Sequence, residues 1–263
     1  MSRIGVAALG LLILTTLAGN SLALSPPSGG TASKPRPSGK TGVAALSPAV
    51  RAEIERLESN DEGRRATGAA ALAAMGIRAA PAVPWLFAAV DDLRPVNSLL
   101  YGRATVAYVA GRALRAIGPS AVDYVMAKLR DPKTSPDDRS AALRAVAIMH
   151  RPEMLTALLQ QLEIACAPGG NACSEYGDAL ECYLPDPRIP EAMLRMAEEL
   201  EHRGDKSPSI LISFTVFVRG HEDGKNDWVK TVTEAKDWWA AHGASATLGR
   251  SSTGRCAEKD PGH

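Results

Sequence analysis

Aromatic side chains are scarce in this sequence. Phenylalanine, tyrosine and tryptophan make up 5% of the 263 residues, although 45% of the residues are hydrophobic. A core built from this composition consists mainly of small apolar side chains, which favours thin and closely packed helices. The four cysteines form no CxxC pair, and the histidines lack the spacing of a zinc-binding pair, so we expect no zinc site.

Catalytic signatures are also missing. The sequence contains no P-loop, no dinucleotide-binding glycine motif and no G-x-S-x-G nucleophile elbow. The histidines stand singly near the ends of expected helices, where a positive charge interacts favourably with the helix dipole. The polar stretch 221–227 lacks both the HExxH motif and the spacing of an EF-hand. We therefore expect no catalytic residue, no cofactor and no metal ion.

The N-terminus has the pattern of a secretory signal peptide over residues 1–23. An apolar run follows Arg3, and small residues stand at the cleavage position after Ala23. The alternative is an uncleaved membrane anchor. Cleavage leaves 29 basic and 29 acidic residues, and such a neutral chain is a poor candidate for nucleic-acid binding. We expect a periplasmic or extracellular protein with no membrane span after cleavage.

Two further segments read as disordered. Residues 24–45 are rich in proline, glycine and serine and carry three basic and no acidic residues, which is typical of a flexible linker. Residues 244–263 are again small and polar and are expected to form a tail. The folded part of the chain is therefore predicted to span residues 46–243.

A helical hairpin repeats within residues 46–243. The first helix of each unit contains an Ala-Leu-x-Ala-apolar segment or a close variant of it. These segments begin at Ala71, Ala113, Ala142 and, more faintly, Ala179. The second helix carries an apolar stripe at positions i, i+3, i+4 and i+7. The stripes are Val83/Leu86/Phe87/Val90, Val122/Val125/Met126/Leu129, Leu155/Leu158/Leu159/Leu162 and Met193/Met196/Ala197/Leu200. Neither helix can cover its stripe alone, so the pattern predicts an array of antiparallel helix pairs.

These residues resemble the HEAT family, in particular the short HEAT-like repeats found in phycobilin lyases. The resemblance lies in the start of the first helix at Asp61, the glycines that close it, and the aspartates that end the second helix. The glycines are Gly76 and Gly118, and the aspartates are Asp92 and Asp131. The third unit lacks the glycine, and the fourth and fifth are degenerate. The resemblance implies an all-α fold, an α-solenoid of about five antiparallel helix pairs whose second helices line a concave face. It implies no activity.

Two parts of the array are less regular. The first helix of the second unit is predicted to be long, from about Asn97 to Ile117, because apolar residues continue through it at helical spacing. The segment Ser209–Val218 is rich in β-branched residues and alternates like a strand. We interpret it as the first helix of a capping pair with Asn226–His242, and a strand remains the alternative.

The cysteines of an exported chain suggest disulfides. Cys166 and Cys173 bracket a Pro-Gly-Gly-Asn turn, which predicts a disulfide between them. Cys182 takes the place of a core alanine of the repeat, so it is expected to be buried and to need no bond.

One row of side chains rises above this background. The position two residues after the start of each stripe lies roughly 200° around the helix from it. On three of the four second helices this position holds an aromatic or a charged residue. With the next turn they give a candidate interaction surface made of Trp85, Tyr124, Lys128, Gln161 and Arg195. The alternative is that the two rings pack between neighbouring units.

The functional hypothesis is a non-enzymatic scaffold that holds an unidentified protein partner on its concave helical face. Short solenoids present extended surfaces, which fits the missing catalytic signatures. The alternatives are a lyase-like or chromophore-attachment factor and a purely structural component of the cell envelope.

Overall fold

The computed structural model describes residues 46–96, 104–167, 176–183, 185–204 and 231–243. Within these ranges the regular elements are helices, with one isolated antiparallel bridge, so the all-α prediction is confirmed. The elements are α1 (Pro48–Leu57), α2 (Glu62–Met75), η2 (Gly76–Ala82), α3 (Val83–Ala89), α4 (Val106–Ile117), α5 (Pro119–Arg130), α6 (Pro136–Met149), α7 (Pro152–Cys166), α8 (Gly177–Glu181), α9 (Arg188–His202) and α11 (Val232–His242). The expected signal peptide, linker, tail and Ser209–Val218 lie outside the described residues.

Side-chain caps fix where five of the helices begin. In each case a hydroxyl or carboxylate oxygen accepts a hydrogen bond from the backbone N–H three residues further on, which satisfies a donor that has no partner inside the helix. The capping residues are Ser47, Asp61, Thr105, Ser135 and Thr231. Pro48 follows the first of these caps, at a position where no N–H is needed.

The first helices end at a residue with a positive φ. Gly76 has a φ of 55° and Gly118 a φ of 86°. In the third unit, α6 continues to Met149 and His150 takes the same place with a φ of 45°. The repeat therefore aligns three residues later in this unit than the match at Ala142 indicates. Three residues are close to one helical turn, so both alignments bury the same face.

The first helix of the second unit is shorter than predicted. It begins at Val106 instead of near Asn97. The N–H of Val96 donates to the carbonyl of Ala104 at 2.8 Å, and Pro95 forms an antiparallel bridge with Thr105. These bonds require extended backbone on both sides of residues 97–103, so the helix cannot continue through residues 104 and 105. Similarly, α11 begins only at Val232, after its Thr231 cap, and residues 226–230 of its predicted span lie outside the described part.

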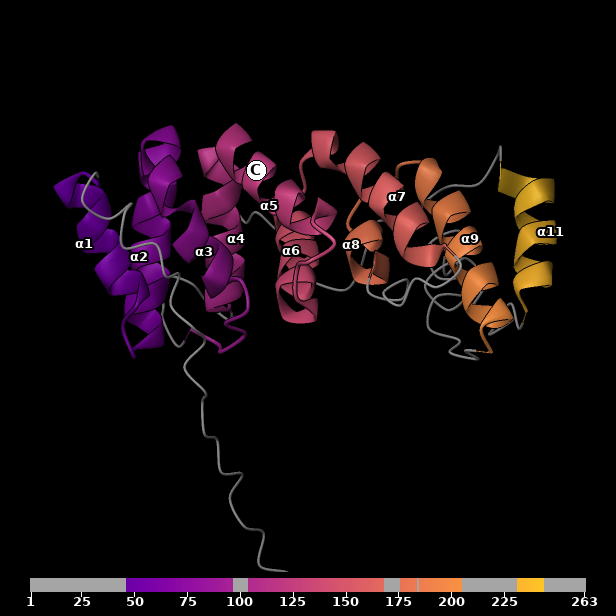
Figure 1. The fold of residues 1–263 in the computed structure, drawn as a ribbon, viewed down its shortest axis with the longest axis horizontal. Coiled ribbons are helices and arrows are strands. Elements are labelled where there is room, and N and C mark those ends of the chain that lie inside the picture. The colour runs from indigo at the N-terminus through magenta and orange to yellow at the C-terminus, as the bar shows by residue number, and fades with distance from the viewer. Residues whose placement is uncertain (1–45, 97–103, 168–175, 184, 205–230, 244–263) are drawn as a thin grey trace, which may run out of the picture. The chain divides into compact units, whose positions relative to one another are not determined.

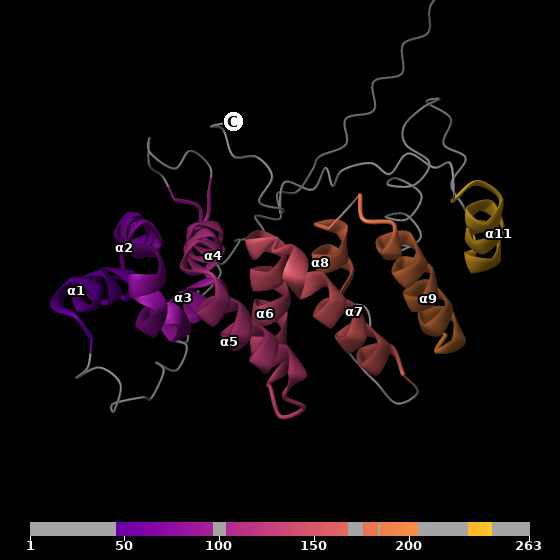
Figure 2. The same cartoon turned by 90° about the horizontal axis from the view of Figure 1, so that it is seen from above.

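Alternate helices contact one another in two series (Figure 1, Figure 2). The even series runs through α2, α4, α6 and α8, and the odd series runs through α1, α3, α5, α7, α9 and α11. The two series are joined by contacts such as those of α3 with α4 and of α5 with α6. The second helix of each pair therefore packs against the second helix of the next pair.

The predicted stripes form the core between the two series. Of the four stripes, only Val122 and Leu159 are half-buried, and the other positions are buried. Small residues allow the helices to approach closely, as the composition predicts. A Cβ on Gly68 of α2 would stand 2.7 Å from the carbonyl oxygen of Glu53 in α1. The alanine-rich helices thus pack backbone against backbone.

One described segment, Glu62–Ala89, is long and apolar enough to cross a membrane by length and composition alone. It comprises two helices, because Gly76 turns the chain and η2 separates α2 from α3. Its buried apolar residues belong to the same cluster as those of the neighbouring helices.

Candidate functional site

The five residues of the candidate surface all lie on helices of the odd series. Trp85 is on α3, Tyr124 and Lys128 are on α5, Gln161 is on α7 and Arg195 is on α9. All are half-buried except Arg195, which is exposed. Both rings pack partly against the core. The row is therefore partly accessible to solvent along its length, and the hydrophobic core holds one side of each of its two rings.

Tyr124 packs between two units. Its ring meets the buried ring of Phe87 from α3 edge to face, with centroids 5.4 Å apart and an interplanar angle of 67°. The ammonium of Lys128 lies 5.9 Å from the centroid of Tyr124 and 6.0 Å from that of Phe87. Such an arrangement fixes the orientation of the Tyr124 ring while part of it remains accessible. Inter-unit packing and surface exposure thus coexist at this residue.

Lys128 is held in place by Asp138 from the start of α6. Their side chains are 3.3 Å apart, and each is 34% exposed. Burial raises the pKa of the Tyr124 phenol. The charge of Lys128 lowers this pKa in part, and the charge of Asp138 raises it further. The phenol therefore remains protonated at neutral pH and is available as a hydrogen-bond donor.

The other end of the row is held more loosely. Arg195 Nη2 lies 3.8 Å from Glu163 Oε1, and these side chains are 55% and 66% exposed. An ion pair this exposed contributes little to stability. Arg195 is therefore an exposed charged group at the end of the row.

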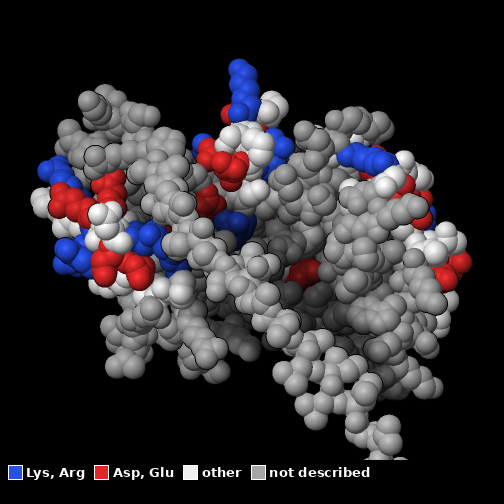
Figure 3. Space-filling view, turned by 90° about the horizontal axis from the view of Figure 1, so that it is seen from below, with Lys and Arg blue, Asp and Glu red and all other residues white. Residues whose placement is uncertain are grey.

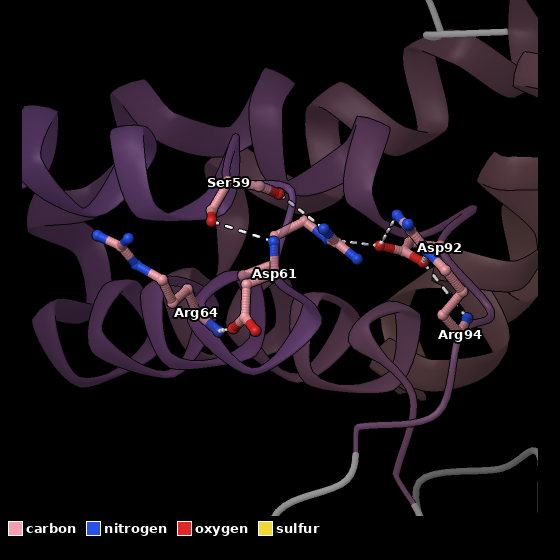
Figure 4. A network of polar contacts seen from close by, with 6 residues as sticks. Ser59, Asp61, Arg64, Asp92 and Arg94 are labelled. Atoms are coloured by element: carbon pink, nitrogen blue, oxygen red, sulfur yellow. Dashed lines mark hydrogen bonds and ion pairs between the residues drawn. The ribbon is translucent and has the colours of Figure 1, made fainter. Parts of the chain in front are cut away.

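A partly buried ionic network, which sequence reasoning did not predict as a unit, joins α2 to the segment that follows α3, and Figure 4 labels Ser59, Asp92 and Arg94 in it. Arg65 is 6% exposed, and its Nε donates to Asp92 Oδ2 at 2.7 Å. Its Nη1 donates to the carbonyl of Ser59 at 2.6 Å, while Arg94 Nε donates to Asp92 Oδ1 at 2.8 Å. The HEAT resemblance pointed to Asp92 as the residue that ends the second helix. Its partner Arg65 stands 27 residues earlier, and no local pattern in the sequence marks the pair.

The neighbouring carboxylate extends this network to the third unit. Arg144 of α6 donates through Nη1 to Asp91 Oδ1 at 2.7 Å and to the carbonyl of Val90 at 3.3 Å. Asp91 and Asp92 are adjacent in the chain but accept hydrogen bonds from different helices, α6 and α2 respectively.

The charges around Asp92 keep its carboxyl ionised. Burial of the Asp92 carboxyl opposes its ionisation, but the hydrogen bond from Arg94 and the charge of Arg65 outweigh burial and lower the pKa of Asp92. Among the described residues, no three histidine, cysteine or acidic side chains gather as metal ligands.

Of the two cysteines in the described ranges, neither Cys166 nor Cys182 is a free thiol. Cys182 is 3% exposed, so its predicted burial is confirmed. The prediction that it forms no disulfide is wrong. Cys173 lies outside the described residues, and its pairing with Cys166 stays a prediction.

Among the described residues that are visible in Figure 3, charges of both signs lie next to one another. Comparison of the chain with family models, with curated proteins and with solved structures gives no match in any of the three.

Proposed function

We propose that this chain is an exported, non-enzymatic HEAT-like α-solenoid that holds a protein partner on the face formed by its odd-numbered helices. The contacts of successive odd helices, α3 with α5, α5 with α7 and α7 with α9, support this proposal. Such a series places corresponding positions of the repeat side by side on one extended surface.

The observation that carries the proposal is the anchoring of Tyr124. Its ring rests on the buried Phe87 and is flanked by Lys128, so binding costs little additional side-chain entropy. Aromatic residues held in this way are the commonest hot spots of protein interfaces. Trp85 supplies a second half-buried ring on the adjacent helix. Gln161 and Arg195 then provide a polar rim.

Capture from cell-envelope extract tests the proposal. The captured protein is identified by mass spectrometry and purified, and its affinity is then measured for the wild type, Trp85→Ala and Tyr124→Ala. We expect each substitution to weaken binding at least about tenfold, as is typical of aromatic hot spots.

Tyr108 offers a matched control, because it is also a half-buried tyrosine but lies on α4 of the even series. Tyr108→Ala should leave the affinity unchanged. Equal losses for Tyr108→Ala and Tyr124→Ala would mean that binding follows general stability instead of the odd face. Full binding by both Trp85→Ala and Tyr124→Ala would refute the proposed surface.

A further inference from the structure

The end of α3 holds two helices that belong to different pairs. Asp92 accepts from Arg65 of α2, in the same helix pair, and Asp91 accepts from Arg144 of α6, in the third pair. The partners stand 27 residues before and 53 residues after the two carboxylates. Two adjacent side chains thus connect elements on either side of the whole second pair, α4 with α5.

This arrangement departs from an ordinary repeat array. In such arrays each unit contacts only its neighbours, so a disturbance passes from unit to unit. Here α3 contacts α6 directly, and Arg144 also donates to the carbonyl of Val90 in the last turn beside α3. Arg144 of α6 therefore binds both the backbone at the end of α3, through Val90, and a side chain there, that of Asp91.

We infer that Asp91 and Asp92 act as an ionic clamp that couples the first helix pair directly to the third. The buried Arg65 ties its own helix to Asp92, so loosening α2 loosens the end of α3. The bond from Asp91 to Arg144 then carries this loosening to α6 without passing through α4 or α5. This coupling is a property of the chain alone and does not depend on the proposed protein partner.

Hydrogen exchange of the full chain, read by mass spectrometry, tests the clamp. Ala71→Gly loosens α2 from within, because glycine weakens a helix interior. We expect this substitution to speed amide exchange about fivefold in α2 and measurably in α6. When Asp91→Asn is also present, the effect of Ala71→Gly on α2 should persist while its effect on α6 disappears.

Asp131→Asn is the matched control. Asp131 follows α5, as Asp91 and Asp92 follow α3, but it is exposed, and within the described ranges its carboxylate accepts only from the N–H of Lys133. The response of α6 to Ala71→Gly should survive this change. An equal α6 response with and without Asp91→Asn would show that the signal passes through α4, and the clamp would be refuted. No α6 response to Ala71→Gly in the otherwise wild-type chain would refute it as well.

If Asp91→Asn prevents folding, Arg144→Gln removes the same bond from the other side. The charge that remains after this replacement is that of Asp91, whose side chain is 25% exposed, so no deeply buried charge is left behind. The expected exchange pattern is the same, and a retained α6 response again overturns the clamp.

Discussion

Gly111 of α4 and Ile148 of α6 approach each other so closely that position 111 has no room for a side chain. A Cβ on Gly111 would stand 2.5 Å from Cγ2 and 2.7 Å from Cβ of Ile148. Glycine normally weakens the interior of a helix, because it gains backbone freedom on unfolding. Its presence in the middle of α4 is explained by the contact between α4 and α6, where the loss is offset by closer packing of the two helices.

Gly111→Ala should therefore destabilise the protein, although alanine is the better helix former. Overpacking of this kind costs about 1–3 kcal/mol, which urea denaturation would detect. Ile148→Ala removes Cγ2, the nearest of the atoms in the way, and keeps Cβ, so it relieves part of the overlap and the double variant should lose less than the two single variants added together. Gly63→Ala is the control, since its Cβ would meet only Asp61 Oδ1 at 3.3 Å. A stabilising effect of Gly111→Ala would contradict this packing.

Asp92→Asn should be among the most damaging single substitutions in the chain. It leaves the charge of buried Arg65 without its carboxylate, at a cost of about 3–5 kcal/mol. The lowered pKa of Asp92 also fixes the pH dependence. Its contribution is fully present above the ordinary pKa of an aspartate and is lost as the pH falls through the lowered value.

The difference in unfolding free energy between wild type and Asp92→Asn should thus narrow only in acid, below about pH 4. Asp186→Asn, which alters the exposed pair with Arg188, should barely move the unfolding midpoint. A difference that is constant down to strong acid would mean that Asp92 does not act through its charge.

Leu129→Ala tests the core of the repeat. Leu129 is buried at the last stripe position of α5, so its truncation should cost about 2–5 kcal/mol through lost burial and a cavity. Tyr124→Ala on the same helix removes a half-buried ring and an aromatic pair worth about 1 kcal/mol beyond the lost burial, and it should cost less than Leu129→Ala. Equal losses of stability from Leu129→Ala, Tyr124→Ala and Trp85→Ala would show that the rings serve packing alone.

His150 allows the backbone at the end of α6 to be tested by itself. It has a φ of 45°, and its ring meets that of Tyr183 at 5.2 Å. Both His150→Gly and His150→Ala remove the ring, but only glycine adopts this backbone without strain. The glycine variant should be the more stable of the two by about 1 kcal/mol in thermal or urea unfolding. The opposite order would indicate that the turn does not keep its left-handed conformation.

The predicted disulfide is tested by mass mapping under non-reducing conditions. Peptides containing Cys166 and Cys173 should be recovered linked to each other from exported protein. Recovery of all four cysteines as free thiols would contradict both the disulfide and the expected export of the chain.

The stripes of the second helices were predictable from sequence because helical periodicity is local. Val83, Leu86, Phe87 and Val90 had to lie on one side of any helix that contains them, and all four are buried. The start of α4 was not predictable in this way, because apolar residues before Thr105 fit a helical pattern as well as those after it. A hydrogen-bonded bridge between residues 95–96 and residues 104–105 decided the boundary, and such a bridge has no sequence signature of its own.

The same limit applies to the candidate surface and the clamp. Spacing placed Tyr124 away from its own stripe but could not reveal that Phe87 of another helix lies beneath it. The pairing of Asp91 with Arg144 depends on which helices become neighbours in space. Contacts across 53 residues are consequences of packing and are fixed only when the whole array assembles.

The bridge before α4 also makes the chain tractable for engineering. Val96 and Ala104 are joined by a backbone hydrogen bond of 2.8 Å, so the two ends of residues 97–103 already stand side by side. The entropy of closing a loop grows only slowly with its length, by about 0.6 kcal/mol for each doubling. An epitope or a fluorescent reporter inserted within residues 97–103 would consequently leave the helices on either side undisturbed. It would give a label at a known place in the array.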